Sequence, residues 1–127
     1  MKVYKFEDLT IWQLARSIVK DIYVIFESCK DFGFTNQTQR AAVSIMNNIA
    51  EGFDRSRNSK DNKQFVNFLN ISYGSCGEVR SMLYTAEDLG YINPEEAKNF
   101  RNRCTDMSIK IDSLMTTLRQ HEVTNTK

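Results

Sequence analysis

The sequence predicts an all-α protein, an antiparallel up-down bundle of four helices. Long stretches carry apolar residues at helical spacing, and no segment alternates apolar and polar side chains over the length of a strand. Glycines and the single proline divide these stretches into four, joined by short connections. With 127 residues and 41% hydrophobic residues, the chain is long enough for one core and too apolar for a disordered protein.

The first helix is expected over about residues 8–30, with Asp8 as its N-cap. From Ile11 to Phe26, its apolar side chains cover about half of the helix circumference, more than the ~100° stripe that one neighbouring layer requires. The apolar residues of this helix are Leu9, Ile11, Trp12, Leu14, Ala15, Ile18, Val19, Ile22, Tyr23, Ile25 and Phe26. This width predicts contact with more than one surface. Gly33 is expected to end the helix in a left-handed turn.

The second helix is expected over about residues 36–55, capped by Thr35 or Asn36. Its inner stripe consists of Ala42, Ile45, Met46, Ile49 and Phe53. The third helix is expected to begin after a cap at Asn58 or Ser59 and to reach about Leu89, with Gly90 just beyond its end. Its inner stripe consists of Phe65, Phe68, Leu69, Ser72, Cys76, Val79, Leu83 and Ala86.

The fourth helix has the clearest start signal. Asn93 is the expected N-cap, Pro94 takes the first helical position, and two acids follow in the first turn. A heptad seam then runs through Ala97, Phe100, Cys104, Met107, Ile111, Leu114 and Leu118. We expect this helix to end near Gln120, which divides the chain into a bundle domain, residues 1–120, and a flexible polar tail, residues 121–127.

Composition favours a cytoplasmic protein with no membrane segment. No apolar run approaches the ~20 residues that a membrane span needs, and residues 1–7 lack the apolar core of a signal peptide. Cys29, Cys76 and Cys104 are odd in number and form no CxxC pair, so we expect reduced thiols in or near the core. The net charge of +1 argues against a dedicated electrostatic nucleic-acid binder.

The sequence predicts no catalytic, cofactor-binding or metal-binding residue. The Glu-x-x-His motif of di-metal bundles is absent, and the single histidine, His121, lies near the C-terminus. The segment from Gly74 to Gly77 lies within a helix and lacks the lysine of a phosphate loop. A small carboxylate enzyme using Glu51 and Glu78 is a further hypothesis. It requires a deep polar pocket joining them, whereas helical spacing directs both away from the inner stripes.

A strip of small residues lies opposite the inner stripe of the third helix. It consists of Asn70, Gly74, Gly77 and Ser81. Each glycine within an exposed helix costs about 1 kcal/mol relative to alanine, so two of them need a reason. Apolar residues flank the strip, namely Val66, Ile71, Tyr73, Met82 and Tyr84. Small residues let another helix approach closely, and we therefore predict a subunit interface here.

A basic cluster lies between the second and third helices. It consists of Arg55, Arg57, Lys60 and Lys63, and Asp54 and Asp61 dilute its charge. A solvated loop is one interpretation, and contact with the phosphates of a nucleic acid is the other.

Several motifs resemble one known family. They are Gln39-Arg40-Ala41-Ala42-Val43-Ser44-Ile45 and Asn48-Ile49-Ala50-Glu51-Gly52, then Phe6, Asp8, Leu9, Trp12, Phe65, Phe68, Leu69, Gly74, Ser75 and Glu78, and Leu89-Gly90-Tyr91-Ile92. The matching positions span about residues 6–118. In them the sequence resembles the small proteins encoded in intervening sequences of 23S ribosomal RNA genes, also called S23 ribosomal proteins. The accessory variability protein of diversity-generating retroelements is a relative.

The resemblance implies a four-helix bundle that assembles as a homopentamer and has no enzyme activity. The retroelement relative binds its reverse transcriptase and nucleic acid through a basic surface. Here Met46-Asn47 stand where many members carry Pro-Ser, and the charge is close to neutral. Two functions follow as hypotheses: an oligomeric scaffold that binds another macromolecule, or a nucleic-acid-binding accessory protein.

Arg40 and Glu51 belong to the signature motif yet face outward on the helical wheel. They lie eleven residues apart, which is too far for a direct pair on one helix. We predict that each meets a partner on a neighbouring helix or subunit, with Glu78 as a partner for Arg40.

Overall fold

The computed structural model describes the backbone of residues 3–125 and the side chains of residues 3–121. A 3-10 turn, η1 (Phe6–Asp8), precedes four helices within this range. They are α1 (Thr10–Ile25), α2 (Phe32–Ser56), α3 (Lys63–Asp88) and α4 (Pro94–Asn125). The predicted all-α class and the four-helix bundle are confirmed. The structure contains one chain, and the pentameric ring stays a prediction.

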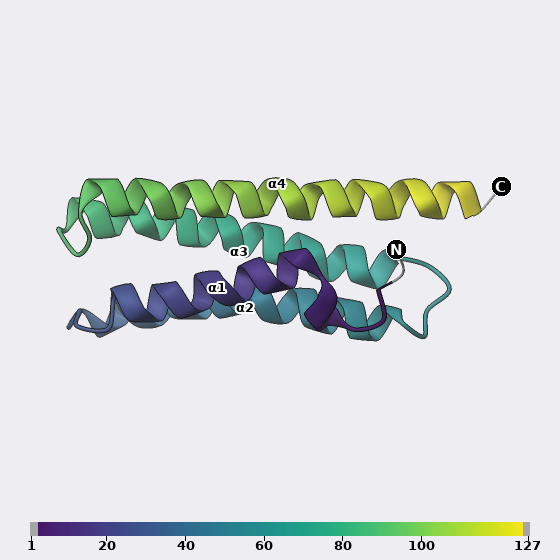
Figure 1. Ribbon diagram of the computed structural model, residues 1–127, viewed down its shortest axis with the longest axis horizontal. Helices are drawn as coiled ribbons and strands as arrows, with labels where there is room; N and C mark the ends of the chain where they lie inside the picture. Colours follow the sequence, from purple (N-terminus) through teal and green to yellow (C-terminus); the bar gives the residue numbers. More distant parts are fainter. Residues whose placement is uncertain (1–2, 126–127) are drawn as a thin grey trace.

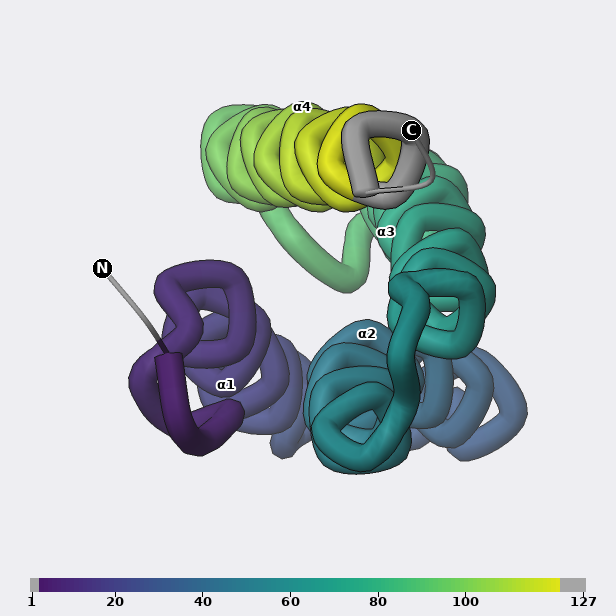
Figure 2. Tube along the Cα trace, turned by 90° about the vertical axis from the view of Figure 1, so that its right-hand side faces the viewer, coloured from purple at the N-terminus to yellow at the C-terminus, as the bar shows by residue number. Residues whose placement is uncertain are grey.

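The four helices run up and down along the long axis of the molecule (Figure 1). The α1–α2 and α3–α4 turns lie at one end, and the α2–α3 connection lies at the other, near the start of the described chain. Seen end-on, the helices follow one another around the bundle, so that α2 and α3 each have a neighbour on both sides (Figure 2). Among the neighbouring helix pairs, α1 and α4 form the smallest contact.

The start of α1 and the start of α2 differ from the prediction. Leu9 rather than Asp8 precedes α1, because Asp8 belongs to the 3-10 turn and makes no capping hydrogen bond. The α2 helix starts at Phe32, since the carboxylate of Asp31 accepts a hydrogen bond from the backbone N–H of Phe34 at 3.1 Å. Gly33 therefore lies inside α2 and does not end α1.

The start of α3 also lies later than predicted. Asn62 precedes the helix, and the carboxylate of Asp61 accepts a hydrogen bond from the backbone N–H of Lys63 at 3.0 Å. The amide of Asn62 instead donates to the carbonyl of Leu118 at 3.0 Å, which ties this end of α3 to α4. The predicted caps Asn58 and Ser59 are wrong, because the connection continues for several residues beyond them.

The α3–α4 turn confirms the sequence signals. Gly90 has φ of +74°, and the backbone N–H groups of Gly90 and Tyr91 donate to the carbonyls of Glu87 and Ala86. These two bonds are those of a Schellman motif. The Asn93 side chain then accepts a hydrogen bond from the backbone N–H of Glu96 at 2.8 Å and caps α4.

The predicted stripes form most of the core. Buried side chains come from all four helices, and each helix supplies members of its predicted stripe. On α4 the seam ends earlier than expected: Leu114 and Leu118 are half-buried, and Met115 is buried. The helix continues to Asn125, beyond the predicted end near Gln120. The last part of the predicted tail, residues 126–127, lies outside the described residues.

Candidate functional site

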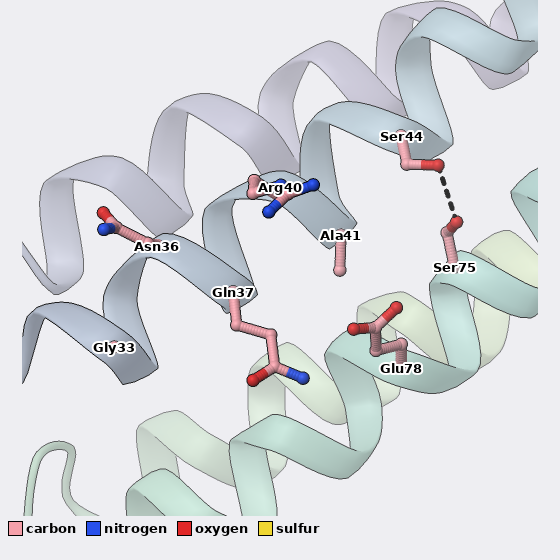
Figure 3. Close-up of a pocket in the computed structure, with 8 residues that line it drawn as sticks. All are labelled: Gly33, Asn36, Gln37, Arg40, Ala41, Ser44, Ser75 and Glu78. Atoms are coloured by element: carbon pink, nitrogen blue, oxygen red, sulfur yellow. Dashed lines mark hydrogen bonds between the residues drawn. The ribbon is translucent and has the colours of Figure 1, made fainter.

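A polar groove of about 530 Å³ lies between α2 and α3 (Figure 3). Its walls are formed by Gly33, Asn36, Gln37, Arg40, Ala41 and Ser44 of α2 and by Ser75 and Glu78 of α3. The lining residues of α2 recur at spacings of three and four, so they share one flank of that helix. The volume lies within the range of about 300–1,000 Å³ that is usual for small-molecule sites.

Hydrogen bonds between small side chains close one end of the groove. The Ser75 hydroxyl lies 2.8 Å from that of Ser44, which also accepts a hydrogen bond from the Asn48 amide at 3.0 Å. One turn earlier on α3, the buried Ser72 hydroxyl donates to the carbonyl of Ile45 at 2.8 Å. These bonds fix the register of α2 against α3 and therefore hold the two walls in place.

The groove contains two opposite charges that do not pair. Arg40 extends from α2, and the carboxylate of Glu78 rises from α3 into the space between the helices (Figure 3). Neither has a hydrogen-bond or ion-pair partner within the part of the chain that the structure describes. The predicted Arg40–Glu78 pair is thus brought to one site but not to ion-pair distance. A role for the two residues between subunits stays a prediction.

Most other arginines of the described chain are paired. Arg101 lies 2.8 Å from Glu87, and Arg103 lies 2.8 Å from Asp21 and joins α4 to α1. Arg80 donates to Thr105. Arg57 and Arg119 also have no partner in the described part of the chain, but of these three arginines only Arg40 lines the groove.

Glu51 does not contribute to the groove. Its carboxylate pairs with Arg55 at 2.8 Å on the same helix, so it needs no partner on another helix. Glu51 lines neither the groove between α2 and α3 nor the smaller pocket between α1 and α4, so neither of these two pockets joins it to Glu78.

The predicted interface strip lies on the outer face of α3. Asn70, Gly74 and Ser81 are exposed and Gly77 is half-exposed. A Cβ atom added at Gly74 or Gly77 would meet nothing within 4 Å, so no contact with the residues that the structure describes requires glycine there. Ile71, Tyr73 and Tyr84 flank the strip and are 51%, 44% and 56% exposed. Val66, also expected beside the strip, is buried instead.

The basic cluster lies at the end of the bundle where α2 connects to α3 (Figure 1). Arg57, Lys60 and Lys63 are exposed. Arg55 is paired with Glu51, and its guanidinium lies 5.5 Å from the centroid of the Phe68 ring. The cluster therefore presents fewer unpaired cations than the sequence suggests.

The cysteines are free, as expected. Burial raises the pKa of the Cys76 thiol to about 11 and that of Cys104 to about 12. Within the described residues, no group of three or more His, Cys, Asp or Glu side chains is arranged to hold a metal ion. Nor is any helix in that range long and apolar enough to cross a membrane.

Sequence reasoning missed Asn36, Gln37 and the groove itself. A helical wheel assigns polar residues to the outside of a helix but gives no width for the space between two helices. The sequence does contain one sign of close helix packing: the small residues Ala41 and Ser44 on α2 and Ser75 on α3. These residues line the end of the groove where the two helices meet.

The fold and these surfaces define a class: a small up-down helical bundle with a polar inter-helix groove and an open glycine face. The family model described as 23S rRNA-intervening sequence protein matches residues 7–113, and the chain belongs to this family.

A solved structure gives the same fold. It is a protein of unknown function from the S23 ribosomal protein family of Bacteroides thetaiotaomicron, 22% identical in sequence, with a TM-score of 0.74. The alignment covers 84% of this chain and 98% of that one. Among curated proteins, none matches this chain.

Proposed function

We propose that this chain is a non-catalytic subunit of a homo-oligomeric scaffold that binds another macromolecule, with a protein as the first candidate. A homopentameric ring is the assembly that the family resemblance implies. We also propose a cytoplasmic location, because a reducing compartment keeps thiols such as the three cysteines of this chain free.

The outer face of α3 carries the proposal. It combines two glycines with open space over them and three large apolar side chains that are 44–56% exposed. Each glycine inside an exposed helix destabilises it by about 1 kcal/mol relative to alanine, and at Gly74 and Gly77 no close contact with the described residues offsets this cost. A helix of another subunit packed on this face would bury the apolar side chains and use the close approach that glycine permits.

Light scattering after size-exclusion chromatography tests the assembly. The mass expected is a multiple of the 14.8 kDa chain, and five copies for a pentamer. Gly77→Arg should release subunits, because its long side chain blocks close approach but has room in the single chain. Thr116→Arg, on the exposed face of α4, is the matched control and should leave the mass unchanged. A wild-type protein that stays a single copy at high micromolar concentration would remove the proposal.

A nucleic-acid-binding role is the second candidate, favoured by the exposed cations Arg57, Lys60 and Lys63 in one connection. Phosphate contacts release counterions, so affinity should fall steeply with salt concentration. Fluorescence anisotropy with a labelled RNA over a salt series measures this slope, and Lys60→Gln should reduce its magnitude by about one per lost contact. Lys98→Gln on α4 is the control. No binding at low salt would exclude this role.

A further inference from the structure

We propose that the groove between α2 and α3 binds a small zwitterionic ligand, of the free α-amino acid or unblocked short-peptide class. The guanidinium of Arg40 would receive the ligand's carboxylate, and the carboxylate of Glu78 would receive its ammonium group. On α3, Ser75 faces α2, and Glu78 stands one turn from Gly74, between that flank and the glycine strip. The ligand is a small molecule that enters the groove between α2 and α3, rather than a helix packed on the outer face of α3. The inference therefore goes beyond the proposed scaffold.

The unpaired charges are the first argument. Four ion pairs within the described chain have closed to 2.8–3.0 Å, including two between different helices. Arg40 and Glu78 face the same groove but remain apart. A ligand with one charge of each sign can bridge that separation, and an Arg–carboxylate contact is bidentate and geometrically selective.

The remaining lining gives the second argument. Asn36 and Gln37 carry amides that both donate and accept hydrogen bonds, and neither has a partner within the described part of the chain. Apolar lining is limited to the small side chain of Ala41 and the backbone at Gly33. Such a surface suits a compact polar molecule and disfavours a large apolar one.

The rigid walls give the third argument. The Ser72–Ile45 and Ser75–Ser44 hydrogen bonds fix α2 against α3 beside the groove. Because Arg40 and Glu78 stand on these helices rather than on loops, the spacing of their backbones is set before a ligand arrives, while their exposed side chains remain free to adjust to it. Preorganisation of this kind reduces the entropy lost on binding.

Calorimetric titration with dialanine and a panel of other unblocked dipeptides and free amino acids tests the proposal. Two blocked probes are matched to dialanine: N-acetyl-dialanine lacks the ammonium group, and dialanine amide lacks the carboxylate. The unblocked peptide should bind, and each blocked form should bind at least about tenfold more weakly. Tighter binding of free amino acids than of dipeptides would identify a free α-amino acid, rather than a short peptide, as the ligand class.

Charge-neutral variants assign each contact. In Glu78→Gln, dialanine and its N-acetyl form should bind equally, because the partner of the ammonium group is gone. In Arg40→Gln, dialanine and its amide should bind equally. Arg57→Gln and Glu95→Gln remove exposed charges outside the groove and should leave binding unchanged.

The proposal would be overturned by the absence of any heat of binding from all panel members up to about 10 mM, or by equal binding of blocked and unblocked dialanine to the wild-type protein. The mass of each variant separates this site from the oligomer. Lost binding with unchanged mass supports the ligand site, whereas loss of the assembly in Arg40→Gln and Glu78→Gln would assign both residues to the subunit interface instead.

Discussion

Gly52 occupies a place where α2 and α3 leave no room for a side chain. A Cβ atom at this position would lie 2.6 Å from the Cβ of Phe68 and 3.2 Å from Cδ1 of Phe65. The Phe68 Cβ is fixed to the α3 backbone and cannot turn aside as the far end of a flexible side chain would. The glycine of the signature motif is therefore required by packing between helices.

Gly52→Ala should destabilise the protein. Overpacking costs about 1–3 kcal/mol, and an approach of 2.6 Å to an atom fixed to the backbone belongs to the upper part of that range. This cost exceeds the gain of about 1 kcal/mol that alanine brings to a helix interior. Urea denaturation followed by circular dichroism measures the change. Gly33→Ala is the matched control, since the nearest atom to its Cβ lies 3.7 Å away, and it should be neutral or stabilising. A more stable Gly52→Ala variant would contradict the packing argument.

Asp31 links the two turns at one end of the bundle. Its carboxylate accepts hydrogen bonds from the Tyr91 hydroxyl at 2.7 Å and from the backbone N–H of Phe34 at 3.1 Å. These bonds, the Tyr91 bond foremost, lower the pKa of Asp31 from its ordinary value of 3.8. A lowered pKa means that the folded state favours the ionised form. The resulting stabilisation is present above about pH 4 and is lost as the pH falls through the folded pKa.

Tyr91→Phe should raise the pKa of Asp31 back toward 3.8, because it removes the largest cause of the shift. The same variant should lose less stability than wild type on acidification below pH 4. An NMR titration of the Asp31 side-chain carboxyl carbon reports the pKa directly. An Asp31 pKa that does not move in Tyr91→Phe would show that the hydroxyl has no such role.

At the scale of the element, the sequence predicted which face of each helix is buried more accurately than where each helix begins. Ile45 and Leu69 are buried as their spacing requires, since apolar periodicity is local and strong. Helix starts depend on competition between neighbouring caps, and at α2 the Asp31 carboxylate prevails over Thr35 and Asn36. Gly33 shows the effect of this competition. Glycine is compatible both with a left-handed turn at a helix end and with the first turn of a helix. Because Asp31 caps α2, Gly33 lies in the first turn of that helix.

The α3–α4 seam leads to a prediction about thiols. Cys76 and Cys104 are fully buried with pKa values of about 11 and 12, so at pH 8 they carry very little reactive thiolate. Cys29 is only half-buried, after the end of α1. With a thiol reagent at pH 8, Cys29 should react first, and the two core thiols at least about 100-fold more slowly until urea is added. Rapid native labelling of all three, located by peptide mass, would show that α3 and α4 separate readily.

At the scale of the whole molecule, the sequence predicted the up-down order, because four amphipathic segments with short connections leave few alternatives. It did not predict the unequal helix contacts, in which α1 and α4 form the smallest contact between neighbouring helices. Nor did it predict the groove, whose width depends on how α2 and α3 cross. The glycine strip on the outer face of α3 was predictable, because two exposed glycines are unfavourable within a helix. Residues that oppose the local structure in this way are expected at functional sites.

That strip yields opposite predictions for a single bundle and for an assembly. In an isolated chain, Gly74→Ala with Gly77→Ala should stabilise α3 by about 1 kcal/mol per site, since each Cβ enters open space. In an oligomer packed on the strip, the added methyl groups separate the helices and weaken association. Binding of subunits stabilises the folded state by mass action, so the wild-type melting temperature should rise with protein concentration. The double variant should therefore melt above the wild type in dilute solution and lose that advantage as concentration rises. Calorimetry from low to high micromolar protein concentration measures both melting temperatures and distinguishes the two cases. If the melting temperature of the double variant stays above that of the wild type by the same amount at every concentration, the strip on α3 faces only water.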